Sequence, residues 1–320
     1  MKFWFATLSF AAALALAPGA PSLAAPGLPS TNVAWLPAAA DADIERAFAQ
    51  ARSEKKPVLL YWGATWCPPC NQLKATLFNR QDFAELSRHF VAVHVDGDRP
   101  GAQKLGSRFK VSGYPTVVLF GADGQEITRL PGEVDAPQVI AVLQAGLAAG
   151  RPVKTLLADA LAARPLSANE WRSLAFYSWE TDEQQLISKS DLPGTLARLA
   201  AASPATDGAT GDRLWLKALA ASDDGQGVKP DVALRERVLR ALADPVRSRA
   251  LMDVISNGAD DIVKTLDAEG TPGRAQSRAA FETALRRFEA DTTLSRNDRL
   301  GALYARVLLA RLDQPKDAVQ

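Results

Sequence analysis

The most reactive side chains of the sequence lie in one short segment, GATWCPPCNQLK, which runs from Gly63 to Lys74. This segment contains both cysteines of the 320-residue chain, Cys67 and Cys70, with two prolines between them. A disulfide at this spacing closes a loop too small to constrain the unfolded chain much. We therefore interpret the pair as a redox couple that exchanges disulfides, rather than as a structural crosslink.

The flanking residues predict a strand that delivers Cys67 to the start of a helix. Residues 58–63, VLLYWG, form a continuous apolar run, which is typical of a strand buried on both faces. The amides of a helix start stabilise a thiolate, so Cys67 is the expected nucleophile, and Cys70 is placed one turn later to resolve a mixed disulfide. Pro68 suits the first helical turn. Pro69 removes a second donor, which predicts a less extreme thiol pKa than in strongly oxidising motifs.

The first half of the chain alternates between predicted strands and helices in the order β-α-β-α-β-β-α. This order predicts a mixed sheet, parallel at first and with one antiparallel hairpin, flanked by helices on both faces. Residues 25–40 are expected to form a tether, although residues 32–35 could add a strand. The other predicted strands are 58–63, 91–95, 113–120 and 126–130, and the predicted helices are 41–52, 67–78, 82–90, 102–109 and 135–149.

The second half has a different texture, because strand-like runs disappear after Arg151 and Ala, Leu and Arg recur at helical spacing. Sequence signatures of capping boxes mark helix starts at Ser167/Glu170, Thr181/Gln184 and Ser295/Asp298. We predict an α/β domain at 41–150 and an all-α domain at 151–320. The latter should hold six to eight helices, as a bundle or a short solenoid. A fragment of residues 25–150 is expected to fold alone and to exchange thiols with a small disulfide.

Residues 1–24 have the layout of a secretory signal peptide. Lys2 precedes a short apolar run, and small residues before Ala24 fit a cleavage site. We expect export to a bacterial periplasm, with no stable membrane insertion after cleavage. The whole chain has a net charge of +1, and the leader carries one Lys and no acid. A mature chain this close to neutral argues against nucleic acid as a partner.

The motif WCPPC after a buried strand, with GYPT downstream, resembles the thioredoxin superfamily over about residues 33–150. The resemblance implies that Pro115 is cis and faces the cysteines, and that the backbone of Tyr114 pairs with an extended substrate segment. It also implies an aromatic wall at Trp66, a substrate contact at Pro68 and a second substrate loop at Gly132. The stretch TLFNRQDFAELSRHFVAVHVD is similar to the C-terminal domain of transmembrane thiol-disulfide interchange proteins.

One feature departs from the family. Thioredoxins bury an acid six residues before the first cysteine and pair it with a lysine on the next strand. Here those positions match Tyr61 and Ala92, so both members of the ion pair are missing together. This departure implies that thiol-disulfide exchange is slower or has a different reduction potential, and that water or the Tyr61 hydroxyl takes the proton of Cys70.

These features predict an exported thiol-disulfide oxidoreductase that reduces protein disulfides. The alternative is a redox-sensitive binding or scaffold protein whose helical half is the working part. Expected partners are disulfide-containing protein substrates and an upstream thiol donor, for which a membrane thiol-disulfide interchange protein is one candidate. We expect no cofactor and no metal, since copper needs a further His or Met ligand. His94 is expected to hydrogen-bond in the core, and His89 to be a solvated helix end.

Overall fold

The computed structural model describes residues 32–130, 136–182, 185–205, 208–222 and 227–312. The expected signal peptide at 1–24, the first part of the expected tether and Gly132 lie outside these ranges.

The central sheet has five strands in the order β1-β3-β2-β4-β5. Strands β1, β3 and β2 run parallel, whereas β4 is antiparallel to β2 and β5 is antiparallel to β4, which confirms the predicted mixed sheet. The added strand lies later than residues 32–35, inside the segment expected to be a tether, because its position is fixed by pairing with β3. The bounds are β1 Leu36–Ala38, β2 Val58–Gly63, β3 Val91–Asp96, β4 Thr116–Phe120 and β5 Glu126–Leu130.

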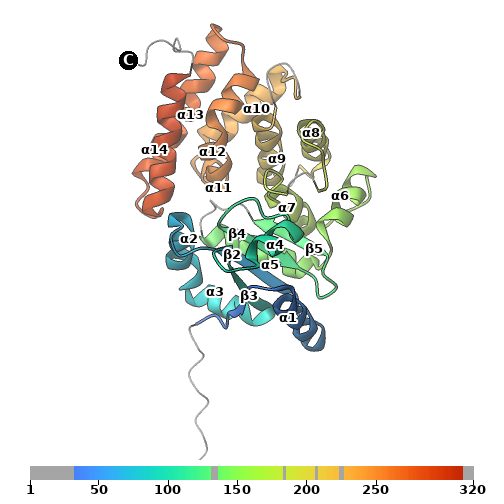
Figure 1. Cartoon of the computed structure of the whole chain (residues 1–320). Coiled ribbons are helices and arrows are strands. Elements are labelled where there is room, and N and C mark those ends of the chain that lie inside the picture. The colour runs from blue at the N-terminus through green and yellow to red at the C-terminus, as the bar shows by residue number, and fades with distance from the viewer. Residues whose placement is uncertain (1–31, 131–135, 183–184, 206–207, 223–226, 313–320) are drawn as a thin grey trace, which may run out of the picture. The chain divides into compact units, whose positions relative to one another are not determined.

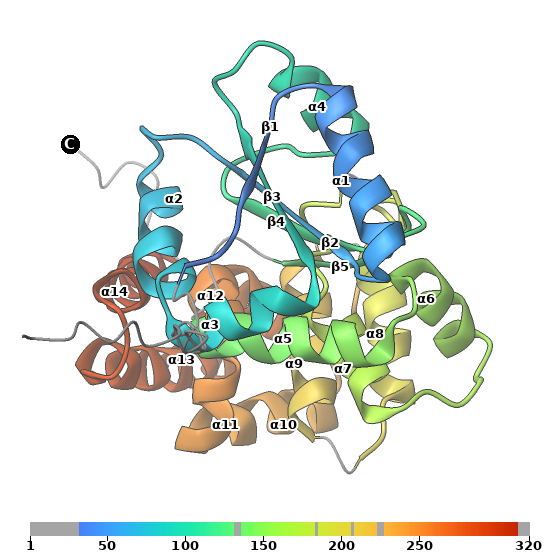
Figure 2. The same ribbon diagram turned by 90° about the horizontal axis from the view of Figure 1, so that it is seen from below.

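Helices cover both faces of this sheet, as Figure 2 shows. Alternate residues of β2 point to opposite faces, so Leu60 packs with the helices of one side and Leu59 with those of the other. The first side holds α1 (Asp41–Glu54) and α4 (Ala102–Arg108). The second holds α2 (Pro68–Leu73), the π-helical turn η1 (Lys74–Phe78), α3 (Gln81–Leu86), the 3₁₀ turn η2 (Ser87–His89) and α5 (Ala136–Ala149).

Beyond residue 150, the described ranges contain helices and loops but no strand, and they form nine helices instead of the six to eight expected. One extra break occurs at Leu251, where no Gly or Pro marks the end of a helix. No described helix is both long and apolar enough to cross a bilayer. Figure 1 shows this region, which comprises α6 (Val153–Leu161), α7 (Ala168–Phe176), α8 (Leu192–Ala202), α9 (Gly208–Ala220), α10 (Val232–Ala243), α11 (Pro245–Ala250), α12 (Met252–Leu266), α13 (Pro272–Ala290) and α14 (Arg296–Arg311).

The core of the sheet continues into the helical region. One cluster of buried residues runs from the sheet through α5 to α7, α8 and α9, and Leu143 and Leu174 are fully buried in it. A second cluster links α9 with α10, α12, α13 and α14. Independent folding of residues 25–150 stays a prediction, and such a fragment would expose the face of α5 that packs against α7.

The outer edge of the sheet, strand β5, is covered by the loop that follows α7. The Ser178 N–H donates to the Arg129 carbonyl at 3.0 Å, and the Tyr177 hydroxyl donates to Glu126 at 2.8 Å. The Arg129 guanidinium is fully buried and donates to Glu126 and to the Phe109 carbonyl. A bare edge strand invites pairing with other chains, so this cover also protects the sheet.

A buried ion pair holds the helical region together. Arg213 of α9 donates to both carboxylate oxygens of Asp253 on α12, at 2.6 and 2.7 Å, and its guanidinium lies 3.7 Å from the centre of the Phe176 ring. Burial is the largest single influence and raises the pKa of Asp253, but the Arg213 charge and hydrogen bonds together with the Lys217 charge outweigh it, and the pKa lies below its ordinary value. The carboxylate is therefore charged, and its removal would leave the buried Arg213 guanidinium without a counter-ion.

We predict that Asp253→Ala lowers the free energy of unfolding by about 3–5 kcal/mol, because Arg213 keeps its charge without a partner. The matched control is Asp260→Ala on the same helix, which removes the more exposed Asp260–Lys264 pair and should cost about 1 kcal/mol or less. Urea unfolding of both variants measures the difference. Equal losses would show that the Arg213–Asp253 pair is not a structural requirement.

Candidate active site

The structure places the two cysteines where the sequence predicts them. Strand β2 ends at Gly63, and Cys67 is the residue that caps the amino end of α2. Cys67 and Cys70 are joined by a disulfide, with Cα atoms 5.2 Å apart. The Cys70 N–H donates to Cys67 Sγ at 3.2 Å. Pro68 and Pro69 have no N–H, so this amide is the first of the helix that can stabilise a Cys67 thiolate.

The disulfide lies just below the surface beside an exposed indole. Trp66 is 67 % exposed, whereas Cys67 is 3 % and Cys70 0 % exposed. The Trp66 Nε1–H donates to Asp98 Oδ1 at 2.9 Å, which fixes the ring against the loop after β3. The sequence predicts Trp66 as an aromatic wall but does not single out Asp98. Asp98 lies two residues after the end of β3, the strand that pairs in parallel with β2, and such strand ends meet at one edge of a sheet, so Asp98 can be found once this pairing is known.

Two hydrogen bonds hold the loop between β2 and α2 in place. The Gly97 N–H donates to the Gly63 carbonyl at 2.9 Å, which joins the ends of β3 and β2. The Asn71 side-chain amide donates to the Thr65 carbonyl at 2.9 Å, which ties α2 back to the loop in front of it. The position of Cys67 is thereby fixed from both sides.

The Tyr114-Pro115 peptide is cis, as the resemblance implies. Thr116 Oγ1 donates to the Gly113 carbonyl at 2.7 Å and closes this turn. Tyr114 packs against the small cluster formed by Ala64 and the two cysteines, so the turn lies next to the disulfide. Room for the Tyr114 ring depends on Gly97, where a Cβ would collide with the ring.

The missing acid–lysine pair is replaced by two stacked rings. In the sheet, Ala92 lies opposite Leu59, and the residue directly opposite Tyr61 is His94. The rings of Tyr61 and His94 stack with centroids 5.0 Å apart. Neither the Tyr61 hydroxyl nor His94 Nε2 has a hydrogen-bond partner among the described residues, so the predicted core hydrogen bond of His94 is not made through Nε2.

Both rings are neutral at physiological pH. Burial raises the pKa of Tyr61 to about 12, so its hydroxyl keeps its proton. Burial lowers the pKa of His94 below its ordinary value, the Lys74 charge lowers it further, and Asp96 opposes both. The Tyr61 hydroxyl leans over Gly63, where a Cβ would collide with it, so its oxygen points along β2 toward the dithiol loop. Its role as the proton acceptor of Cys70 stays a prediction.

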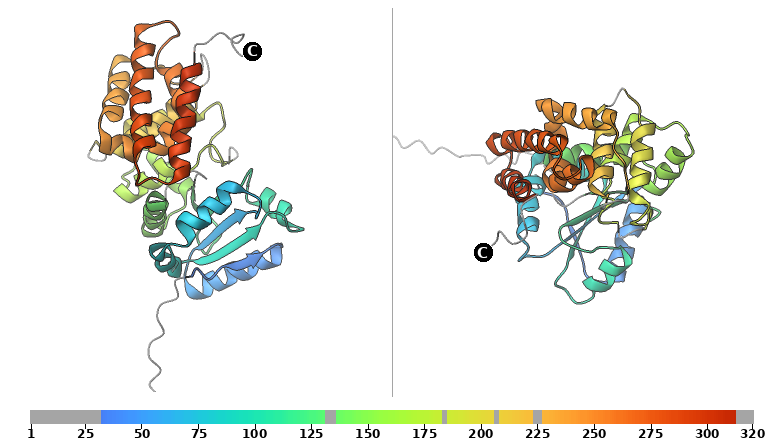
Figure 3. Two further views of the ribbon diagram at one scale, coloured as in Figure 1. Left: turned by 90° about the vertical axis from the view of Figure 1, so that its left-hand side faces the viewer. Right: turned by 90° about the horizontal axis from the view of Figure 1, so that it is seen from above.

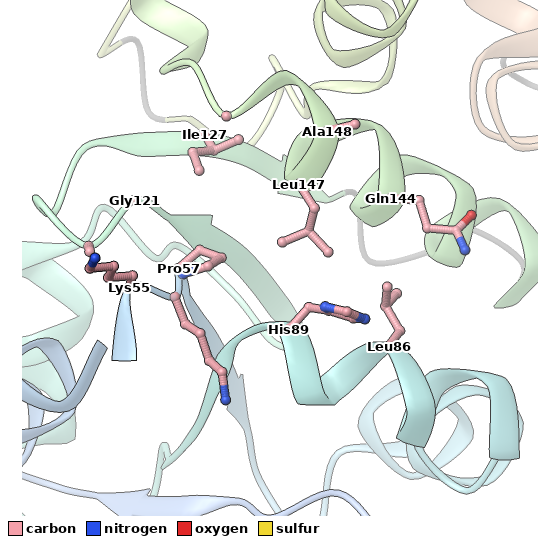
Figure 4. Close-up of a pocket in the computed structure, with 12 residues that line it drawn as sticks. Lys55, Pro57, Leu86, His89, Gly121, Ile127, Gln144, Leu147 and Ala148 are labelled. Carbon is pink, nitrogen blue, oxygen red and sulfur yellow. The ribbon is translucent and has the colours of Figure 1, made fainter. Parts of the chain in front are cut away.

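A separate pocket opens at the other end of β2, with a volume of about 660 Å³. Figure 4 shows Leu147 pointing into it above His89. Pro57, which precedes β2, is part of the lining, whereas Cys67 follows the strand. The length of β2 therefore separates the pocket from the disulfide, and the pocket does not belong to the candidate active site.

Among the described residues, no group of His, Cys, Asp or Glu side chains is arranged to hold a metal ion. The predicted second substrate loop at Gly132 lies outside the described residues, so its place relative to the disulfide stays a prediction.

Comparison with known proteins agrees with this geometry. The thioredoxin-like domain family matches residues 44–147. A thioredoxin-like protein of Synechocystis is 35 % identical over 89 residues, which are 28 % of this chain and 80 % of that protein. The thiol:disulfide interchange protein DsbD 2 of Pseudomonas aeruginosa is 31 % identical over 116 residues. That match covers 35 % of this chain and only 20 % of the length of the interchange protein.

Solved structures also match part of the chain. The oxidoreductase DsbH is 20 % identical, with a TM-score of 0.33, and the match covers 41 % of this chain and 95 % of that one. A thioredoxin from Thermus thermophilus is 27 % identical, with a TM-score of 0.32, over 36 % of this chain and 88 % of that one.

The buried His94 predicts a pH-dependent stability. A histidine whose pKa is lowered by folding contributes fully above its ordinary value of 6.5, and this contribution is lost as the pH falls, because protonation favours the unfolded state. We expect the wild type to lose more unfolding free energy between about pH 7.5 and about pH 5.5 than His94→Gln does.

Urea unfolding at the two pH values measures this loss, with His89→Gln as the control because it leaves His94 in place. An identical loss in the wild type and in His94→Gln would contradict the assignment.

Proposed function

The chain belongs to the thioredoxin-like family, and on that basis we propose that it is an exported thiol-disulfide oxidoreductase that reduces protein disulfides. The observation that supports this most is the position of Cys67 Sγ, which caps α2, receives the Cys70 N–H and lies beside the cis Tyr114-Pro115 turn. These features suit a cysteine sulfur that must carry a negative charge and react with a sulfur of the substrate.

The first step uses the reduced dithiol. The Cys67 thiolate attacks one sulfur of a substrate disulfide and forms a mixed disulfide with it, and the other substrate sulfur leaves as a thiolate. The helix amides lower the cost of the Cys67 charge before the attack. With Pro68 and Pro69 in the first turn, fewer amides share this task, which favours a reductant over a strong oxidant.

The second step releases the substrate. Cys70, once deprotonated, attacks Cys67 Sγ, so that the Cys67–Cys70 disulfide forms and the second substrate sulfur leaves as a thiolate that takes up a proton. The substrate gains two electrons and the protein loses two. The position of the family's acid is occupied by Tyr61, so we propose that water takes the proton of Cys70, guided by the Tyr61 hydroxyl.

A polypeptide substrate has a binding surface next to Cys67. We propose that the exposed Trp66 ring and Pro68 form one side of it, and that the backbone at Tyr114 pairs with an extended segment of the substrate. Gly132 is proposed to belong to the opposite wall. No cofactor takes part, because the two sulfurs carry both electrons.

Regeneration needs a thiol donor that reduces the Cys67–Cys70 disulfide. We propose a membrane thiol-disulfide interchange protein for this role and the periplasm as the compartment. The proposal is supported by the similarity to the interchange protein DsbD 2 and by the signal-like residues 1–24. The helical region at 151–320 is proposed to recognise the partner while the α/β region performs the exchange.

Turnover distinguishes this function from that of a redox-sensitive scaffold. The oxidoreductase should accelerate the reduction of insulin by dithiothreitol, in proportion to protein concentration over many cycles. A scaffold would react once per molecule. Insulin turbidity with catalytic amounts of the full chain measures the difference, and a single stoichiometric burst would favour the scaffold.

The two cysteines should behave differently when each is replaced. Cys67→Ser should form no mixed disulfide, because the remaining sulfur is fully buried. Cys70→Ser should accumulate a mixed disulfide on Cys67, because resolution is lost while attack is retained. Mass spectrometry of each variant after incubation with oxidised insulin measures the adduct. An adduct on Cys70 in the Cys67→Ser protein would reverse the roles.

A further inference from the structure

The last helix has an apolar face that no described part of the chain covers. Four of its residues, which we call the α14 stripe, are between 39 % and 65 % exposed: Leu300, Leu303, Tyr304 and Val307. Their spacing places them on one side of the helix. The opposite side packs into the helical core through Ala302, Ala305 and Leu309. Helix α14 therefore has two apolar faces, of which one lacks a partner.

We propose that the α14 stripe docks an acidic amphipathic segment of the protein whose disulfide is exchanged at Cys67 and Cys70. The proposal rests on the proposed function, and it assigns part of partner recognition to this helix. Exposed apolar side chains gathered on one face commonly mark an interaction site.

The charges around the stripe select an acidic occupant. Arg296 and Arg311 are exposed at the two ends of the helix, about 22 Å apart along its axis. Three described acids near α14 are already engaged, since Asp298 caps the start of the helix and Glu282 and Glu289 pair with Arg306. A segment with an apolar face and carboxylates at both ends complements this pattern.

A second copy of the chain fits this surface poorly. In an antiparallel two-fold pairing of α14 with itself, Arg296 faces Arg311, and in a parallel one each arginine faces its own copy. Either arrangement brings like charges together.

Two other occupants are also disfavoured. The eight residues after Leu312, DQPKDAVQ, are mainly polar and offer no apolar stripe of their own. Anionic membranes attract strongly basic proteins. The net charge of this chain is only +1, which disfavours a membrane as the occupant.

The orientation of the helix links the stripe to the dithiol. Figures 1 and 3 show that the amino end of α14 is the end nearer to α2, the helix that Cys67 caps. A partner segment that lies along the stripe is thus directed toward the side of the protein that carries the dithiol.

The test uses the full chain and a synthetic peptide of about 18 residues. The peptide carries leucines at helical spacing, glutamates at both ends and a terminal cysteine blocked as a mixed disulfide with a chromogenic thiol. A copy with lysines at both ends is the charge control. Fluorescence anisotropy measures binding, and chromophore release measures exchange. The free chromogenic disulfide measures the chemistry alone.

We expect Tyr304→Glu to weaken binding of the glutamate-ended peptide about tenfold and to slow its exchange at low concentration. Its rate with the free disulfide should stay unchanged. Val232→Glu, at an exposed apolar residue of α10, should change neither quantity. The double variant Arg296→Glu/Arg311→Glu should prefer the lysine-ended peptide.

Four results would overturn the proposal. They are equal binding of both peptides by the wild type, no effect of Tyr304→Glu, a dimer in sedimentation that Tyr304→Glu dissociates, and attachment to anionic vesicles that Tyr304→Glu abolishes. Failure of the proposed function would look different, because the wild type would then bind the peptide but leave the free chromogenic disulfide intact.

Discussion

The hydrogen bond from the Cys70 N–H to Cys67 Sγ is the interaction on which the proposed chemistry of this protein depends. It exists because β2 is buried along its whole length and ends at a fixed place, so that the loop after it delivers Cys67 to the start of α2. The loop is held by Asn71 on one side and by the Gly97–Gly63 contact on the other. Since both intervening residues are prolines, this single amide bears most of the stabilisation that a thiolate receives from the helix.

The helical half braces this arrangement. It extends the core beneath α5, and its loop at Tyr177 and Ser178 covers the edge strand β5, which pairs with β4, the strand that follows the cis-proline turn. The sheet that positions the dithiol is therefore supported by both halves of the chain. The α14 stripe, on the last helix of that half, remains free for a partner.

Much of the site could be predicted from the sequence, because the apolar run before WCPPC and the GYPT motif each fix a local structure. The cross-strand neighbour of Tyr61, which is His94, could not be predicted, because the register is set by pairing with the other strand. The position of β1 shifted for the same reason. The break at Leu251 carries no Gly or Pro, so the helices beyond 150 were undercounted. Asp98 is found only once β3 is known to lie next to β2.

The order of alkylation in the reduced protein tests the central claim most directly. Iodoacetamide is added in limiting amount near neutral pH, and mass spectrometry of the peptides locates the label. Cys67 should be alkylated first. As the pH is raised, its alkylation rate should level off at a pH below the ordinary thiol pKa of about 8.5, because the helix start stabilises its thiolate. Label that appears first on Cys70, or a Cys67 rate that rises only around the ordinary thiol pKa, would contradict the assignment of Cys67 as the activated nucleophile.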